Sequence, residues 1–497
     1  MAKSSRSFKA LILGSGSAAT ALVSLIIAAV LSRNFDKGDY ATFRQTLLVY
    51  EFAAPLLTLG LPAALFYFLP GETSRARAIL LENLILLGVM GLLFSFFLAF
   101  GGNSLLADRF SNPALEKTLL VFALYPVLFL PASAASACLV VRDKVHWFTI
   151  HIVATRLARL GLVLGAIWIF PDSPLAAISA ITISSFLTCG SALVLMFRAV
   201  PRTGISRPSR HGLTSQLKYA IPLGLAVMLE SMALGIDKVL VSILCEPDQF
   251  AVFVNGAMEI PFIRMITAAT MAVILPEIVA FYKTGKKAEA LGLWQRSARK
   301  IAVLLLPLGG LLFVAAPELM TLFYSGEYVE SSRPFRIYLL LLPARVIFFG
   351  VIFQAAGRSD LILKRAVGTL LLNAAVSYPM IKYFGIEGAA WGTVVVFWLY
   401  VIPYCLAYCS RLLDTVWFRL MPFRHLGMIL LAIVGAMLVA SQMRPFLPAG
   451  HTLSVAVLVS AGYVVILMPA LILLCRSELR QYWQMLLRVL PGNRGRS

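Results

Sequence analysis

The chain is poor in charged residues and has no polar stretch long enough to form a soluble domain. Asp, Glu, Lys and Arg make up 13% of its 497 residues, whereas hydrophobic residues make up 60%. The six cysteines and five histidines are dispersed and show no spacing typical of a metal site. This scarcity argues against a disulfide-stapled extracellular domain and against a resident metal ion.

The hydrophobic residues are collected in long runs separated by short gaps. Mean hydropathy is +0.87, and runs such as 11–31, 79–100, 119–141 and 426–440 carry few charges. A helix needs about 20 apolar residues to cross the bilayer core, and we count about fourteen such runs. The sequence therefore predicts an all-α polytopic membrane protein. We expect no cleavable signal peptide, because the first run has spanning length and lacks a cleavage site followed by a soluble chain.

Basic residues collect in every second gap between the runs. The net charge is +20, and Lys and Arg cluster in the gaps at 75–77, 142–144, 198–210, 283–287, 358–365 and 411–424. The other gaps are neutral or acidic, as at 171–174 and 327–330. Short loops rich in Lys and Arg stay in the cytoplasm, so both termini are expected there, in an inner-membrane protein. The charge thus reports topology; a nucleic-acid-binding protein would need a basic soluble face.

An internal duplication is indicated, with a period of about 210 residues. Segments 36–43 (DKGDYATF) and 246–253 (EPDQFAVF) share the pattern acidic-x-x-polar-aromatic-Ala-x-Phe. About six spans separate the copies, so the two halves enter the membrane in the same sense. We predict two pseudo-symmetric six-helix lobes followed by two C-terminal helices.

The expected domains follow from this repeat. They are an N-lobe of residues 1–200, a cytoplasmic linker at 201–216, a C-lobe at 217–412, two further spans within 413–476, and a tail at 477–497. The linker is rich in Pro, Arg, Ser and Gly. The tail places Leu479, Trp483 and Leu486 on one face and Arg480 and Arg488 elsewhere, as in a helix that lies on the inner membrane surface.

Four segments carry a resemblance to a known family: 219–224 (YAIPLG), 235–242 (GIDKVLVS), 251–258 (AVFVNGAM) and 383–392 (YFGIEGAAWG). They resemble the polysaccharide-biosynthesis flippases, the Wzx-type lipid-linked oligosaccharide translocases of the multidrug/oligosaccharidyl-lipid/polysaccharide exporter superfamily. The likeness covers nearly the whole chain in span number and order. The peptidoglycan-precursor flippases share this architecture, but their family-specific patterns are not found here.

The resemblance implies two lobes around a central cavity that opens alternately to the inside and to the outside. It implies an undecaprenyl-diphosphate-linked oligosaccharide as substrate, for surface polysaccharide such as lipopolysaccharide. The implied partners are this lipid-linked oligosaccharide diphosphate, membrane lipids and the polysaccharide polymerase machinery, with no nucleic acid. No cofactor is implied.

Several ionisable residues lie inside predicted spans, where each costs roughly 2.5–3.5 kcal/mol to insert and therefore usually faces water or a partner. They are Arg44, Glu51, Arg156, Arg159, Glu230, Asp237, Lys238, Glu259, Arg264 and Arg345. Cations outnumber anions in this set, which favours a positively charged internal cavity. Arg binds phosphate oxygens bidentately and keeps its charge. We therefore predict that Arg44, Arg156, Arg159, Arg264 and Arg345 line the cavity and bind the diphosphate.

The alternative is that these charges form interhelical ion pairs that hold the lobes together. Arg44 with Glu51 and Lys238 with Asp237 are the obvious pairs. A third interpretation concerns coupling. Asp237 and Glu230, seven residues apart beside Lys238, can bind Na⁺ or a proton in a half-wet cavity; the competing interpretation is that Asp237 is only a counter-charge for Lys238.

Two other functions compete with the flippase. A cation-coupled multidrug exporter of the same superfamily would favour acidic residues in its cavity, which the excess of cations argues against. A membrane polysaccharide polymerase or ligase would carry catalytic residues on a large outer loop. No outer gap here exceeds about twenty residues, and none pairs carboxylates or histidines for catalysis. We therefore expect no enzymatic activity.

Overall fold

All regular structure is helical in the residues that the structure, a computed structural model, describes. These are residues 6–202, 204, 207–258, 261–443, 445, 452–476 and 478–480, without the side chains of 6–15, 226, 261, 262, 264 and 272. Eleven helical stretches of this part are long and apolar enough to cross a membrane, and two bent helix pairs raise the number to thirteen. The predicted all-α polytopic architecture of about 14 spans is therefore confirmed.

The helices form two compact units by their contacts. Unit 1 comprises Met1–Val254 and Ala366–Ala389, and unit 2 comprises Asn255–Arg365 and Ala390–Ser497. The division of the chain into lobes at 1–200 and 217–412 stays a prediction.

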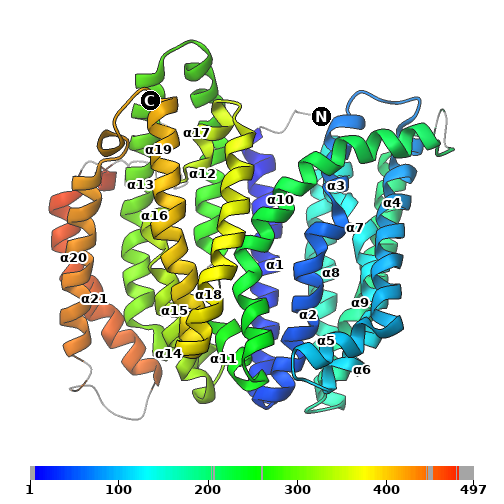
Figure 1. Cartoon of the computed structure of the whole chain (residues 1–497), viewed down its shortest axis with the longest axis horizontal. Helices are drawn as coiled ribbons and strands as arrows, with labels where there is room; N and C mark the ends of the chain where they lie inside the picture. Colours follow the sequence, from blue (N-terminus) through cyan, green and yellow to red (C-terminus); the bar gives the residue numbers. More distant parts are fainter. Residues whose placement is uncertain are drawn as a thin grey trace, which may run out of the picture. The chain divides into compact units, whose positions relative to one another are not determined.

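The helices of unit 1 are labelled in Figure 1. They are α1 (Arg6–Asn34), α2 (Lys37–Thr58), α3 (Leu61–Phe68), α4 (Ala76–Phe97), the π-helix η1 (Leu98–Gly102), α5 (Asn103–Arg109), α6 (Ala114–Phe122), α7 (Leu124–Val141), α8 (Val145–Ile169), α9 (Pro174–Ala199) and α10 (Arg210–Leu244). Helices α11 (Pro247–Gly256) and α18 (Ser359–Val396) contribute residues to both units.

Unit 2 contains the remaining helices. They are α12 (Pro261–Lys283), α13 (Lys287–Val314), α14 (Ala316–Phe323), the 3-10 helix η2 (Gly326–Ser331), α15 (Ser332–Leu339), α16 (Leu342–Arg345), α17 (Gly350–Ala355), the π-helix η3 (Phe397–Val401), α19 (Ile402–Leu412), the 3-10 helix η4 (Trp417–Arg419), α20 (Phe423–Gln442) and α21 (Thr452–Leu474). Trp294 is fully buried in the core of this unit, and its indole N–H donates to the Ile347 carbonyl at 2.8 Å.

Local sequence fixes where several helices of unit 1 begin and end. Asp36, Ser173 and Ser209 are the N-caps of α2, α9 and α10, because each side chain accepts a hydrogen bond from a free N–H of the first turn. Gly60, with φ 73°, separates α2 from α3 in the left-handed conformation that glycine tolerates best. The caps at Ser173 and Ser209 thus define where the helices that carry the polar residues Ser184 and Gln216 begin.

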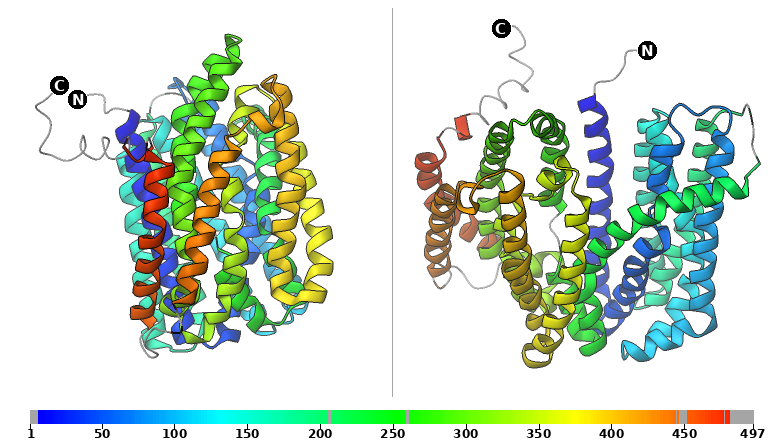
Figure 2. Two further views of the ribbon diagram at one scale, coloured as in Figure 1. Left: turned by 90° about the vertical axis from the view of Figure 1, so that its left-hand side faces the viewer. Right: turned by 45° about the horizontal axis from the view of Figure 1, so that its top comes forward.

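Helix α10 is bent by 41° between Arg210–Leu225 and Val227–Leu244. Its first part packs on α3 and α4 and runs obliquely across them (Figures 1 and 2, right). Along this part every fourth residue is buried: Gly212, Gln216, Ala220 and Gly224. The first two turns of α10 therefore fall within the stretch 201–216 that was expected to be a linker.

Candidate functional site

Helix α8 carries two arginines away from its exposed face. The exposed positions of its central part are Ile150, Ala154, Leu157, Gly161, Leu164 and Trp168, which form one stripe at helical spacing. Arg159 is two residues after Leu157 and therefore about 200° around the helix from it. Arg156 precedes Leu157 by one residue and lies about 100° from it. Both arginines are half-buried. The two arginines thus lie off the exposed stripe and contact other helices of unit 1.

Aromatic rings from three neighbouring helices gather on this inner side. Tyr125 of α7 stacks on Phe122 of α6 and on Phe129, with ring centroids 4.6 and 4.9 Å apart. Tyr50 of α2 meets Tyr125 edge to face at 5.0 Å. Such contacts orient the rings relative to one another and fix the position of the Tyr125 hydroxyl.

Both guanidinium groups lie against these rings. Arg159 lies over Tyr125 and Phe129 at 5.6 and 5.7 Å, and Arg156 lies over Phe129 at 5.9 Å. Arg159 also donates from Nε to Ser184 Oγ at 3.1 Å and from Nη2 to the Tyr125 hydroxyl at 3.3 Å. We call Tyr125, Phe129, Arg156, Arg159 and Ser184 the arginine cluster.

The arginine cluster contains positive charge without a carboxylate to balance it. Neither Arg156 nor Arg159 forms an ion pair with any acidic residue in the part of the chain that the structure describes. The negative faces of the rings stabilise the cations in part, at about 0.5–2 kcal/mol each. Two neighbouring cations inside a bundle still repel each other, so an anion that enters the cluster gains both attraction and directional hydrogen bonds.

The other expected arginines lie on helices other than α8. Arg44 is half-buried on α2, and Arg345 is half-buried at the end of α16, in unit 2. The side chain of Arg264 and all of Glu259 lie outside the described residues. The described contacts therefore bring together two of the five predicted substrate-binding arginines.

The two ion pairs considered from the sequence are not formed. Glu51 is exposed and has no ionic partner in the described residues, so it does not pair with Arg44. Asp237 is 1% exposed, and its Oδ1 accepts a hydrogen bond at 2.7 Å from the backbone N–H of Lys238. The Lys238 ammonium pairs with no described carboxylate. Glu230 is exposed, so its environment differs from that of Asp237.

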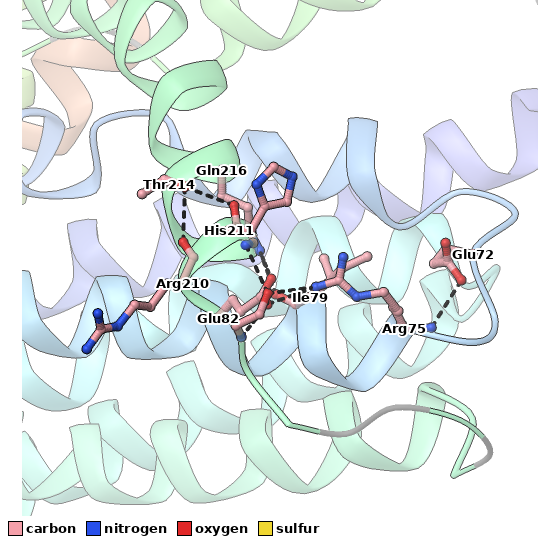
Figure 3. A network of polar contacts seen from close by, with 10 residues as sticks. Glu72, Arg75, Ile79, Glu82, Arg210, His211, Thr214 and Gln216 are labelled. Carbon is pink, nitrogen blue, oxygen red and sulfur yellow. Dashed lines mark hydrogen bonds and ion pairs between the residues drawn. The ribbon is translucent and has the colours of Figure 1, made fainter.

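A second polar centre of unit 1, which the sequence analysis missed, is built around Glu82 of α4. This carboxylate is 1% exposed. Its Oε1 accepts from Arg75 Nη2 at 3.2 Å and from the backbone N–H and hydroxyl of Ser209 at 2.9 and 3.1 Å; its Oε2 accepts from Gln216 Nε2 at 3.3 Å. Figure 3 shows Glu82 between Arg75 and the first turns of α10. A buried charge is thus surrounded by donors.

Gln216 extends this network into the bundle. Its Nε2 also donates to the Ile79 carbonyl at 2.9 Å, and its Oε1 accepts from Asn83 Nδ2 at 2.8 Å. Asn83 Nδ2 further donates to the Leu61 carbonyl at 2.8 Å. We call Arg75, Glu82, Asn83, Ser209 and Gln216 the Glu82 network.

Glycines bring α10 close enough for these bonds. A Cβ on Gly212 would collide with both carboxylate oxygens of Glu82, and a Cβ on Gly224 would collide with the Leu59 carbonyl. A Cβ added to Gly60 would lie 2.9 Å from the backbone nitrogen of Gly224, which is too close for a real side chain. The first part of α10 is therefore attached to α3 and α4 by backbone contact as well as by hydrogen bonds.

The second part of α10 is tied to α2 near its other end. Ser242 Oγ accepts from Gln45 Nε2 at 2.9 Å, and Gln45 Oε1 accepts from Asn112 Nδ2 at 2.7 Å. All three residues are buried. A signal for the Glu82 network was present in the sequence, because Glu82 interrupts the predicted span 79–100 and Gln216 follows Gly212 by four residues.

Unit 2 contains an apolar cavity of about 600 Å³. It lies between α13, α16, α20 and residues 390–398, and Phe313, Trp391 and Trp398 are among the residues that line it. No group of three His, Cys, Asp or Glu residues in the described ranges is placed to hold a metal ion.

Comparison with known proteins gives one family and a set of related folds. Residues 8–281, more than half of the chain, match the model of a family described as polysaccharide biosynthesis protein. No curated protein gives a significant sequence match. The resemblance inferred from the sequence motifs is confirmed by this family match and by the structures below.

Three solved structures are similar to the chain. The lipid II flippase MurJ in an inward closed conformation has a TM-score of 0.72 at 12% identity, covering 94% of this chain and 100% of that one. An inward-facing multidrug resistance MATE family transporter of the MOP superfamily has a TM-score of 0.62 at 17% identity, with coverage of 80% and 96%. A MOP superfamily transporter from Pyrococcus furiosus, whose binding pocket is described as having reverse polarity, has a TM-score of 0.56 at 17% identity, with coverage of 82% and 95%. At these identities the likeness establishes the fold alone.

Proposed function

The chain belongs to the family of polysaccharide biosynthesis proteins, and from that membership we propose that it flips an undecaprenyl-diphosphate-linked oligosaccharide across a bacterial inner membrane. The single observation that carries the proposal is the arginine cluster, in which two cations inside a helical unit have no described carboxylate partner. A diphosphate supplies the missing negative charge. The protein then acts as a transporter in surface polysaccharide synthesis, such as that of lipopolysaccharide, without catalysing a reaction.

The chemistry of the cluster suits binding followed by release. Guanidinium groups bind phosphate oxygens through directional N–H donors and keep their charge at any physiological pH. The aromatic rings hold the cations by contacts that do not compete for those donors. Alternating access requires that the substrate be bound in one state and released in the other. Because the aromatic rings stabilise the positive charge of the arginines in part, the cluster can also exist without the anion, which permits release.

A multidrug exporter of the same superfamily is the alternative, since a MATE transporter is among the structures with this fold. A cationic drug requires an anionic or aromatic site. The aromatic rings of the arginine cluster are already occupied by guanidinium groups, so the cluster favours an anionic substrate. A polymerase or ligase, the alternative from another class, would need catalytic side chains that the described outer gaps do not bring together.

Ion coupling is a separate part of the proposal and rests on Asp237. Its carboxylate is 1% exposed in the middle of α10, and its Oδ1 accepts a hydrogen bond from the backbone N–H of Lys238. A buried carboxylate of this kind is a candidate site for Na⁺ or a proton. The Asp237→Asn variant should flip substrate without responding to an imposed Na⁺ or pH gradient in proteoliposomes. A variant that responds like the wild type would leave Asp237 with a structural role only.

The topology proposed here places both termini and the linker in the cytoplasm, with residues 413–476 adding two spans. The tail expected at 477–497 lies outside the described residues except for 478–480. Cysteine labelling tests it. A cysteine at Thr73, in the exposed loop before α4, should be shielded from an impermeant reagent in intact cells, and one at Arg109, the exposed end of α5, should react. Reaction at Thr73 from outside would reverse the orientation.

The substrate proposal is tested by complementation of a deletion strain. Arg156→Ala and Arg159→Ala should each reduce surface polysaccharide export at least about tenfold while the amount of protein in the membrane is unchanged. Arg109→Ala is the matched control, because this arginine is exposed and outside the cluster. Full export by both cluster variants would remove these residues from the substrate site.

A further inference from the structure

The two arginines of the cluster differ in how they are held. We infer that Tyr125 and Ser184 are positioning residues that fix the Arg159 guanidinium as a preset half of the anion site, while Arg156 forms an adaptable half. This inference rests on the proposed function and assigns roles within that site. It is drawn from hydrogen bonds that Arg159 forms and Arg156 does not.

Ser184 is suited to hold Arg159 because its own proton is already used. The hydroxyl donates to the Ile181 carbonyl at 2.6 Å within α9, and the residue is 1% exposed. Its lone pairs therefore remain available to accept the bond from Arg159 Nε at 3.1 Å. A buried hydroxyl with a committed proton can only be an acceptor for the guanidinium.

Tyr125 fixes the other side of the same guanidinium. Its ring is stacked between Phe122 and Phe129 and met at its edge by Tyr50, so the hydroxyl oxygen has a defined position. This oxygen accepts from Arg159 Nη2 at 3.3 Å. The two bonds take two of the five N–H donors of Arg159 and leave the rest for a ligand.

Arg156 forms a cation–π contact but no directional hydrogen bond with the described residues. Its guanidinium lies over Phe129 at 5.9 Å, and none of its side-chain donors is hydrogen-bonded to the described residues. A guanidinium over a ring can turn and shift at little cost, because the attraction to the ring quadrupole depends weakly on orientation. A diphosphate offers two phosphate groups, and one preset and one adaptable cation can bind them while the carrier changes shape.

The roles make a distinct prediction for lysine substitutions. Lys has a single ammonium, which cannot reach Ser184 and Tyr125 in the fork geometry of Arg159. Arg156 forms no hydrogen bond to the described residues that a lysine would lose. A lysine ammonium at this position, over Phe129, therefore keeps the attraction to the ring and to the diphosphate. Arg156→Lys should therefore keep most of the binding, and Arg159→Lys should lose nearly as much as Arg159→Ala.

Binding of farnesyl diphosphate, a short polyprenyl diphosphate, to the purified full-length protein tests the inference. Tyr125→Phe and Ser184→Ala should each weaken binding about fivefold, and neither should weaken it further in an Arg159→Ala background. The matched controls are Tyr50→Phe and Ser185→Ala. The Tyr50 hydroxyl has no hydrogen bond within the described residues, and Ser185 donates to Thr182 in its own helix without contacting an arginine. Both controls should bind like the wild type.

The outcomes separate this inference from the proposed function. If Arg156→Ala and Arg159→Ala bind farnesyl diphosphate like the wild type, the substrate site itself is wrong. If these two lose binding while Tyr125→Phe and Ser184→Ala retain it, only the positioning role is overturned. Equal losses from Tyr125→Phe or Ser184→Ala with and without Arg159 would also overturn it, because a purely structural effect does not depend on that arginine.

Discussion

The arginine cluster and the Glu82 network are both polar centres inside unit 1, and they differ in whether their charge is satisfied. Glu82 accepts four hydrogen bonds, one of them from a cation. Arg159 donates two hydrogen bonds, both to uncharged hydroxyls, and Arg156 donates none to the described residues; neither pairs with a described carboxylate. A charge whose partners are all supplied by the protein stabilises the fold, whereas a charge that lacks one is available to a ligand.

This contrast assigns different consequences to mutation in the two centres. Loss of Glu82 leaves part-buried donors of Ser209 without an acceptor and removes its bonds to Ser209 and Gln216. Loss of an arginine removes a repulsion as well as a charge. Stability should therefore depend on the Glu82 network, and transport on the arginine cluster.

The largest effect on stability is expected for Glu82→Ala. Breaking a buried, hydrogen-bonded charge should lower the free energy of unfolding by about 3 kcal/mol. Thermal unfolding of the purified protein in detergent measures it. Glu116→Ala is the control, because this carboxylate is exposed on α6 and should change stability by less than about 0.5 kcal/mol. Equal unfolding temperatures for the two variants would contradict the structural role.

Gly212→Ala should destabilise by about 2 kcal/mol, because the added methyl collides with the Glu82 carboxylate. The effect should shrink in the Glu82→Ala background, where the collision is absent. Gly161→Ala, in the middle of α8 with open space around its Cα, should be neutral or stabilising since alanine favours helix. Additive losses in the double variant would show that the two residues do not interact.

Replacement of both Arg156 and Arg159 by Met should change the unfolding free energy by less than about 1 kcal/mol, in either direction, while flipping is lost. The aliphatic side chains fill similar volume, and a pair of like charges is removed. Unfolding measurements and flipping in proteoliposomes are made on the same preparation. A loss of stability as large as that of Glu82→Ala would remove the distinction between the two centres.

The smallest effect concerns Glu72, an acceptor near the Glu82 network but outside the core. Its hydrogen bond from the Ser74 hydroxyl, with bonds from backbone N–H groups such as that of Arg75, lowers its pKa below the ordinary value of 4.5. The ionised form is thus favoured by folding, so the contribution is present above pH 4.5 and is lost as the pH falls through the lowered pKa.

Glu72→Gln should therefore be slightly less stable than the wild type at pH 7, and the difference should disappear in acid. Thermal unfolding as a function of pH measures it, with Glu116→Gln as the control. A difference that grows in acid would have the wrong sign.

The sequence predicted the spans better than their interruptions. Hydropathy placed a span at 79–100, and the structure has α4 from Ala76 to Phe97. It did not predict the break inside α18, where Gly385 adopts φ 59° and ψ −144°. A glycine can leave helical geometry within a single residue, and hydropathy averaged over a span does not register this.

The candidate site was predicted only in part, for a physical reason. The spacing of Arg156 and Arg159 is a local property of one helix and can be read from the sequence. Their contacts with Tyr125, Phe129 and Ser184 join residues on three helices, and no local pattern encodes them. Glu82 was missed although it interrupts an apolar run, because three of its four donor groups, from Ser209 and Gln216, lie more than 120 residues away.

The most direct test compares farnesyl diphosphate affinity with unfolding temperature in one set of variants: Arg156→Ala, Arg159→Ala and Glu82→Ala. We expect the two arginine variants to lose affinity by at least about tenfold and to unfold like the wild type. We expect Glu82→Ala to unfold at a lower temperature and, below that temperature, to bind like the wild type. Arginine variants that unfold early yet bind normally, together with a Glu82 variant that is stable yet fails to bind, would overturn the division of roles between the two centres.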